Sequence, residues 1–216
     1  MPEPEAQKAV EAMAKKVASL DKSTASHIIG EYGAVYTALQ KEAVKIVNIG
    51  QQRKLKSEEV DKMARLTKLE NQLINNVDRF GKIAGEAVTT GQRVAVGLSV
   101  QGAASVASAS LPTGITLNNL AAIGIEWNRL PEEAFEAFIG ISGDGKPVGN
   151  LLAELGRPAA NKVKESIRTG IVTGKSPREV ATVIRQVAGM PLSRALTISR
   201  TEINRAHREA TRLNYA

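Results

Sequence analysis

Apolar residues recur along almost the whole chain in alternating steps of three and four, and this spacing constrains the fold more than any other feature. Residues spaced in this way fall on one stripe of an α-helix. No segment alternates apolar and polar residues with the period of two that a half-buried strand needs. Aromatic residues make up only 3% of the sequence, so the core must consist of smaller side chains, which favours close packing of helix on helix. We therefore predict an all-α fold.

The N-terminal part of the chain is expected to form a long helical hairpin or bundle. The pattern predicts a first helix over about 5–20 and a second from a cap at Ser23 or Thr24 to about residue 55. A third helix should begin at Ser57, where a capping hydroxyl precedes two carboxylates, and continue to about residue 83. Heptad-like spacing in this third helix favours antiparallel packing. Pro and acidic residues also predict a short helix over 131–138.

A segment of small residues, 94–125, interrupts this pattern. It contains no charged residue and is rich in Gly, Ala and Ser. One interpretation is a buried helix whose small side chains let neighbouring backbones approach closely. The other is a membrane-active segment, because small-residue faces also pack transmembrane helices. Ser, Gln and Gly interrupt the run of about 20 apolar residues that a spanning helix needs, so the first interpretation is preferred.

The chain is expected to divide into a bundle over 1–140, a linker over 141–149 and a small C-terminal helical subdomain over 150–216. The linker is rich in Gly, Asp and Pro, which are turn residues. The subdomain should contain one or two helices between residues 151 and 171, interrupted near Pro158.

A capping box is predicted in this C-terminal part. Ser176 stands at the N-cap, Pro177 at the first helical position and Glu179 three residues after the cap. That helix should end at Gly189, and Met190-Pro191 should bridge to a final helix. The predicted apolar stripe of the final helix consists of Leu196, Ser199, Ile203, Ala206, Ala210 and Leu213.

The composition argues against most enzyme chemistry. The chain has no Cys and two His far apart in sequence, His27 and His207. It therefore has no disulfide, no thiolate ligand and no Cys nucleophile, and we expect neither a metal site nor a cofactor. We expect the chain not to be an enzyme. Its first residues are acidic and Pro-rich, unlike a signal peptide, so synthesis in a host cytoplasm is expected.

The net charge of +7 is concentrated near the C-terminus. From Arg157 onward there are twelve Lys or Arg and four Asp or Glu. This imbalance suggests that a polyanion or an acidic protein surface lies near that end.

The Arg-Thr-Glu triplet in the final helix can make two separate contacts. Arg200 and Glu202 point about 200° apart on a helix that turns ~100° per residue, so they cannot share one partner. A carbonyl or carboxylate is expected for Arg200, and an Arg or a helix N-terminus for Glu202. The alternative is an exposed ladder of ion pairs linking Glu202, Arg205, Glu209 and Arg212, each pair worth about 0.2–0.5 kcal/mol.

The capping box and the Arg-Thr-Glu helix together resemble the phage Mu protein F-like head-morphogenesis (minor capsid) family, over about residues 150–216. His207-Arg208 departs from the family, which often has an aromatic residue followed by Asn at this point. The positions that match the family pattern are Gly174, Ser176, Val180, Arg194, Ala195, Ile198, Arg200, Thr201, Glu202, Ala206 and Tyr215.

This resemblance implies a structural protein in the capsid interior of the virion. Several copies would surround the portal and assist head assembly or DNA delivery, in contact with the portal and other head proteins. Family members usually continue past this helix, where Arg200 and Glu202 would normally find a partner. The residues expected to contact the portal or other assembly partners are Arg194, Arg200, Thr201, Glu202 and Arg208.

Two further interactions are considered for the same chain. The basic C-terminal part could touch packaged DNA phosphates without reading sequence. An alternative function is an internal protein ejected with the DNA, whose segment 94–125 would contact the host membrane. The residues expected at DNA phosphates are Lys162, Lys164, Arg168, Arg205 and Arg212.

Overall fold

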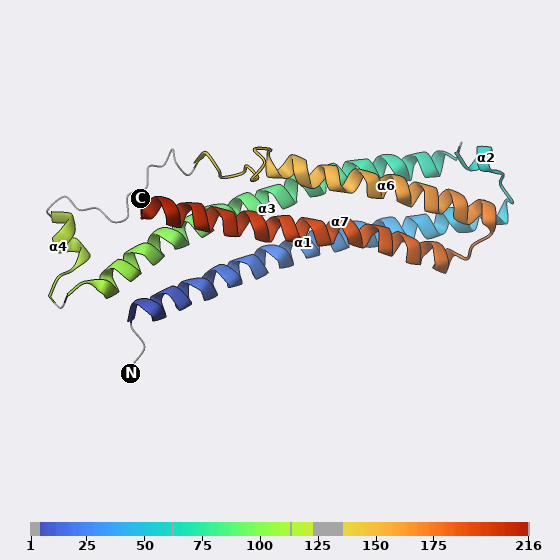
Figure 1. The fold of residues 1–216 in the computed structure, drawn as a ribbon. Coiled ribbons are helices and arrows are strands. Elements are labelled where there is room, and N and C mark those ends of the chain that lie inside the picture. Colours follow the sequence, from blue (N-terminus) through green and yellow to red (C-terminus); the bar gives the residue numbers. More distant parts are fainter. Residues whose placement is uncertain (1–4, 62, 113, 123–135, 216) are drawn as a thin grey trace. The chain divides into compact units, whose positions relative to one another are not determined.

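The structure is a computed structural model, and it describes residues 5–61, 63–112, 114–122 and 136–215. The predicted all-α fold is confirmed (Figure 1). Within these ranges no strand forms, and the only β-type pairing is an isolated bridge between Ile141 and Pro147. The helices are α1 (Glu5–Gln52), α2 (Ser57–Asp61), α3 (Ala64–Ser110), α4 (Leu117–Ala122), α6 (Val148–Thr173) and α7 (Pro177–Asn214).

The long N-terminal helices are longer than the sequence pattern predicted. The two helices expected on either side of Ser23 are one helix, α1. The Ser23 hydroxyl donates to the carbonyl of Leu20 at 2.9 Å, a bond to the preceding turn that lets a Ser lie inside a helix. The third expected helix is divided at its start, since Ser57–Asp61 form the separate helix α2 and α3 begins at Ala64. α3 then continues through the first part of the small-residue segment to Ser110.

Two breaks expected in the C-terminal part are also wrong. α6 passes through Pro158 without ending. A Pro removes a helix hydrogen bond, but buried residues on both sides of it, Leu152 and Ala159, keep this helix packed. The break expected at 189–191 lies inside α7, which is helical from Pro177 to Asn214.

The capping box before α7 is confirmed. The backbone N–H of Ser176 donates to the Glu179 carboxylate at 2.8 Å, and the Glu179 N–H donates back to the Ser176 hydroxyl oxygen at 3.3 Å. The hydroxyl of Ser176 also donates to this carboxylate and lowers the pKa of Glu179. Gly174 ends the preceding element in the left-handed region, with φ of 70°, a conformation that glycine adopts at little cost.

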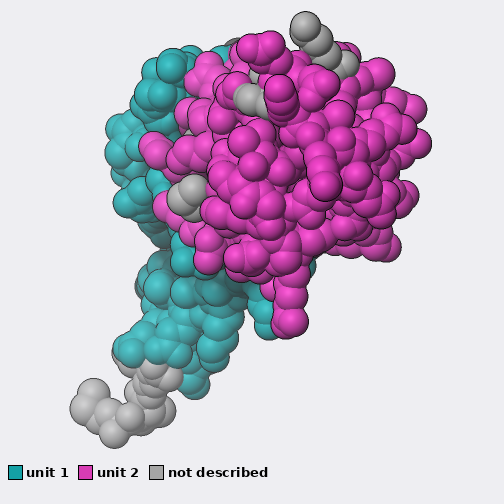
Figure 2. All heavy atoms as spheres, turned by 90° about the vertical axis from the view of Figure 1, so that its right-hand side faces the viewer, with its two compact units in different colours: residues 1–26, 86–148, 198–216 teal, residues 27–85, 149–197 magenta. Residues whose placement is uncertain are grey.

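The chain forms two compact units (Figure 2). Unit 1 contains residues 1–26, 86–148 and 198–216, and unit 2 contains residues 27–85 and 149–197. Each unit therefore draws on both the N-terminal and the C-terminal parts of the chain. This grouping differs from the expected succession of a bundle, a linker and a C-terminal subdomain, because the long helices contribute their two ends to different units.

Unit 2 is a bundle formed by parts of α1, α3, α6 and α7, in which successive long helices run in opposite directions (Figure 1). Its core consists of aliphatic residues from all four helices, among them Ile46, Leu69, Ile167 and Ile184. At Gly81 an added Cβ would lie 2.5 Å from the Cβ of Ala153, so α3 and α6 approach closely there. Ala, Val, Leu and Ile make up this cluster, as the composition predicted, and Tyr32 and Phe80, which pack on each other, are also buried in unit 2.

Unit 1 packs the small residues of α3 against α1 and α7. Val96 forms a buried cluster with Ala206 and Ala210. An added Cβ at Gly102 would lie 3.0 Å from the end of the Met13 side chain, so the missing side chain is what permits this contact. The described part of 94–125 thus agrees with the packing interpretation. Residues 123–135, which include most of the expected helix over 131–138, lie outside the described residues.

Candidate functional site

The central part of the predicted apolar stripe of the final helix is buried within unit 1, whereas Leu213 is half-buried and Leu196, half-buried as well, belongs to unit 2. Ser199, Ile203, Ala206 and Ala210 are all fully buried. Arg200 lies to one side of the stripe, where its Nε donates to the Asp21 carboxylate at 2.9 Å. The expected carboxylate partner of Arg200 is therefore present, and it comes from α1, upstream of the final helix.

Glu202 lies on the opposite side and is buried, with 8% of its side chain exposed. One carboxylate oxygen accepts from the Nε of Arg205 at 2.7 Å. The other accepts from the backbone N–H of Gly143 at 3.1 Å. Glu202 thus has an Arg partner that is separate from the partner of Arg200, and this Arg is Arg205, the first pair of the predicted ladder. The ladder pair of Glu209 and Arg212 also forms and is exposed. The exposed setting is wrong only for Glu202 and Arg205, which are buried against the turn at 138–143.

Arg205 completes this contact from the other direction. Its Nη2 donates to the backbone carbonyls of Ile141 and, at 3.4 Å, of Phe138. The guanidinium therefore neutralises a buried carboxylate and also binds two backbone carbonyls of the turn. We call Glu202, Arg205 and the backbone of residues 138–143 the clamp.

The turn that the clamp holds has its own regular hydrogen bonds. The amide of the buried Gln92 accepts from the N–H of Gly140 at 2.7 Å and donates to the carbonyl of Ile141 at 3.4 Å. Ser142 donates to the carbonyl of Lys146 through both its N–H and its hydroxyl, each at 2.8 Å. The Ser142 hydroxyl also bonds the Asp144 carboxylate and lowers the pKa of that group. The segment expected to be a linker, 141–149, thus contains the predicted turn, and all of it except Gly149 belongs to unit 1.

The chemistry available in the clamp is structural. Its ionised groups neutralise each other, and their remaining hydrogen-bonding capacity is directed at backbone atoms of the same chain. No group of three or more His, Asp or Glu residues that could hold a metal occurs among the described residues. His207 follows the clamp residues on α7. Its Nε2 is buried and has no hydrogen-bond partner in the described part of the chain. Burial lowers the pKa of this imidazole.

The residues expected to contact assembly partners differ in their accessibility. Arg194, Thr201 and Arg208 are exposed on α7, and Arg200 is 70% exposed despite its bond to Asp21. Glu202 is not accessible, because it is enclosed by the clamp. Arg194 belongs to unit 2 and the other four belong to unit 1.

Most of the residues expected at DNA phosphates already have carboxylate partners. Arg205 is bound in the clamp, and Lys162 is exposed and makes no ion pair within the described ranges. The remaining pairs are Lys164 with Glu70 at 2.9 Å, Arg168 with Glu165 at 3.9 Å and Arg212 with Glu209 at 3.1 Å.

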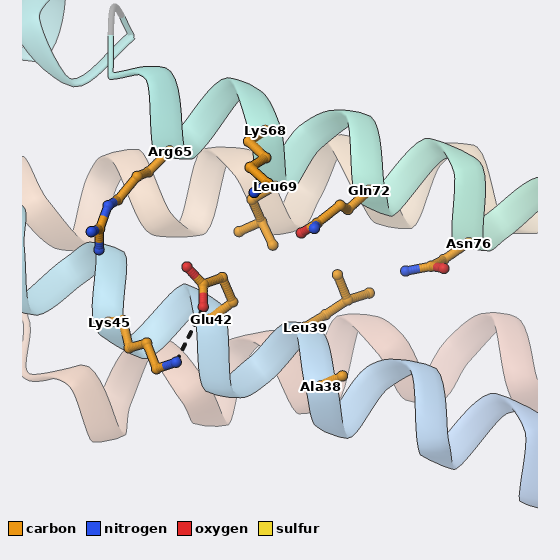
Figure 3. Close-up of a pocket in the computed structure, with 9 residues that line it drawn as sticks. All are labelled: Ala38, Leu39, Glu42, Lys45, Arg65, Lys68, Leu69, Gln72 and Asn76. Atoms are coloured by element: carbon orange, nitrogen blue, oxygen red, sulfur yellow. Dashed lines mark ion pairs between the residues drawn. The ribbon is translucent and has the colours of Figure 1, made fainter.

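Sequence reasoning missed a groove in unit 2, between α1 and α3 (Figure 3). Its volume is about 690 Å³. Leu39 and Leu69, both buried, face each other across it. The other lining residues are Ala38, Glu42 and Lys45 from α1 and Arg65, Lys68, Gln72 and Asn76 from α3. Only the spacing of Arg65 and Lys68 on one helix face could have indicated it.

Across the described ranges, no helix has both the length and the continuous apolar character needed to cross a membrane.

Comparison with known proteins adds no relative, since no family model, no curated protein and no solved structure matches the chain.

Proposed function

We propose that this chain is a structural protein of a phage head, a minor capsid protein that lies in the capsid interior and docks at the portal. Several copies would surround the portal ring and assist head assembly or DNA delivery. The observation that carries this proposal is the clamp. The Glu of the Arg-Thr-Glu triplet, the most distinctive part of the family resemblance, is used to lock the final helix to a turn 59 residues away in sequence.

A structural role explains why each motif element has a packing partner. Ser176 and Glu179 cap α7, and Arg200 and Glu202 bind Asp21 and the turn at 138–143. These contacts fix the position of the final helix and leave no reactive group in the motif. We therefore propose that the chain is not an enzyme.

The docking surface in this proposal is the exposed side of α7. Thr201 and Arg208 lie on the part of it that belongs to unit 1 and are not enclosed by the clamp, and Arg194 is a separate exposed contact on the part that belongs to unit 2. Cationic side chains on a helix fit an acidic surface of a partner protein. Glu202 would contribute indirectly, by holding the helix that carries Thr201 and Arg208.

Co-purification of the full chain with a phage portal protein produced in the same cells tests this function. We expect a complex that an Arg194→Ala/Arg208→Ala variant weakens and that Arg178→Ala, an exposed change at the start of the same helix, leaves intact. Absence of the chain from purified heads, together with no complex with the portal, would refute the proposal.

The alternative of an ejected, membrane-contacting protein has weaker support. Within unit 1 the Ser99 hydroxyl is 2.8 Å from that of Thr211, and Asn214 donates to Ser99 at 3.4 Å. These polar contacts hold the small-residue part of α3 against α7, which is the arrangement of a packed core. Co-sedimentation of the full chain with anionic vesicles separates the two functions, because only the ejected protein should partition.

We also propose non-specific contact with packaged DNA, through fewer residues than the sequence suggested. Lys162, rather than the ion-paired cations near it, is the residue expected to meet a phosphate. Binding of a labelled duplex should then depend only weakly on salt, because the slope of affinity against salt scales with the number of phosphates contacted.

A further inference from the structure

The groove between α1 and α3 has a row of polar side chains with no partner. Arg65, Lys68, Gln72 and Asn76 lie three and four residues apart and therefore share one face of α3. Within the described part of the chain none of them makes an ion pair or a side-chain hydrogen bond. Figure 3 shows all four extending from α3 toward the groove.

Helix stability does not explain the positions of these cations. Arg65 is the second residue of α3, and no acidic residue lies in the first turn of this helix. A positive charge near a helix N-terminus is unfavourable, because that end of the helix dipole is itself positive. The opposite wall adds Lys45, which is paired with Glu42 at 3.4 Å. The groove as a whole therefore carries an excess of positive charge.

The dimensions of the groove suit a short stretch of polypeptide. Its volume of about 690 Å³ lies within the range of roughly 300–1,000 Å³ found for ligand sites. From Arg65 to Asn76 the helix rises about 16 Å, at 1.5 Å per residue. An extended chain of about five residues spans that length, at roughly 3.3 Å per residue.

The mixture of groups favours a peptide over a phosphate backbone. The carboxylate of Glu42 projects into the groove between the two helices (Figure 3). It repels any anion, but it can accept a hydrogen bond from a peptide N–H, a donor that a phosphate backbone does not provide. The amides of Gln72 and Asn76 can each donate to and accept from a peptide bond. Arg65 and Lys68 supply charges that match carboxylate side chains.

We propose that this groove binds a short acidic peptide segment of another protein, with its carboxylates at Arg65 and Lys68 and its backbone at Gln72 and Asn76. Such a site would exist whether or not the chain belongs to a phage head. In the phage setting, the segment would be an acidic stretch of a head protein.

The test is fluorescence anisotropy with the full chain and a labelled peptide of repeated Glu-Ala-Leu, at low ionic strength. The matched probe has Gln in place of Glu, and a labelled oligothymidylate of equal charge represents phosphate. An Arg65→Glu/Lys68→Glu variant should weaken binding of the acidic peptide at least about tenfold, because two attractive contacts become repulsive.

The control is Lys162→Glu/Arg178→Glu, which makes the same change in net charge at two exposed positions of unit 2 outside the groove. This control variant should retain most of the binding of the acidic peptide. Because Arg65 and Lys68 are exposed, the circular dichroism of their variant should stay that of the parent, which separates lost binding from lost folding.

Three results would overturn the proposal. Equal weakening by both double variants would mean that only net charge matters. Tighter binding of the oligothymidylate, lost on the same variant, would assign the groove to a phosphate backbone. Binding of the Gln peptide as tight as that of the Glu peptide would remove the role of the two cations.

Discussion

Replacing the two side chains of the clamp should reveal a strong coupling between them. The Glu202 side chain is 8% exposed and that of Arg205 is 22% exposed. Removing one member leaves the other charge largely buried, which costs about 3–5 kcal/mol for fully buried pairs. Because Arg205 keeps some solvent contact and both residues keep backbone partners, we expect about 3 kcal/mol for Glu202→Ala and for Arg205→Ala.

The double variant should cost less than its parts. With both charges gone, neither is stranded, and the loss should be about 4 kcal/mol, which gives a coupling energy of about 2 kcal/mol. Glu202→Gln should fall between the parent and Glu202→Ala, because its amide oxygen can still accept from the N–H of Gly143 while the charge is lost.

The same helix provides a matched control. Glu209 and Arg212 have the same spacing and the same joined atoms, Nε and Oε2, at 3.1 Å, but their side chains are 40% and 68% exposed. An exposed pair of this kind contributes about 0.3–0.5 kcal/mol. The double-mutant cycle of Glu202 and Arg205 therefore differs from that of Glu209 and Arg212 in burial and not in sequence spacing.

The assay is urea denaturation of each variant, followed by circular dichroism, together with hydrogen exchange of the amides in residues 140–148. Variants of the clamp should lose protection at Gly143, whose N–H bonds Glu202, while the control variants should not. Equal coupling energies in the two cycles, or unchanged exchange at Gly143 in Glu202→Ala, would refute the reasoning.

Two further predictions concern unit 1 and unit 2 separately. Burial lowers the pKa of His207 below its ordinary 6.5, so the unfolded chain binds this proton more readily and the free energy of unfolding should fall as the pH drops below that value. In urea titrations His207→Gln should reduce the fall in the free energy of unfolding between about pH 7 and about pH 5. His27 is exposed, and a similar reduction in His27→Gln would show that the fall does not come from the buried His207. In unit 2, Gly81→Ala would place a Cβ 2.5 Å from that of Ala153 and should cost about 1–3 kcal/mol by forcing α3 from α6. The control is Gly33→Ala, where nothing lies within 4 Å of the added Cβ and where the change should stabilise the helix by about 0.5–1 kcal/mol. If the thermal midpoints of Gly81→Ala and Gly33→Ala moved in the same direction, the packing argument would be wrong.

The features predicted from the sequence are those set by local geometry. The capping box joins Ser176 and Glu179, three residues apart, and the stripe through Ile203 and Ala206 follows from helical periodicity alone. Helix ends were less predictable. Ser23 has the composition of a cap but bonds to the preceding turn, and α6 continues through Pro158 because residues on both sides of it are buried.

The site was predictable only in part, since burial is set by segments distant in sequence. The spacing of Glu202 and Arg205 predicts an ion pair, and the structure contains it. Nothing in that spacing distinguishes it from the pair of Glu209 and Arg212, which is exposed. The groove was missed for a related reason. On α3 alone Arg65 has the pattern of a solvated face, and the groove arises only where α1 lies opposite.

Helical geometry did determine the directions of Arg200 and Glu202, and this has a consequence for how variants should be interpreted. A helix turning about 100° per residue separates them, so one side chain reaches Asp21 and the other reaches Arg205 and Gly143. Glu202 has no surface to offer a partner, and a Glu202 variant that fails to bind the portal would report a displaced final helix. Arg208 is exposed on the same helix, so a change there would test the proposed contact with the portal directly. A variant of Arg208 that keeps the exchange protection of Gly143 but loses the portal therefore locates the docking surface, which the triplet alone cannot do.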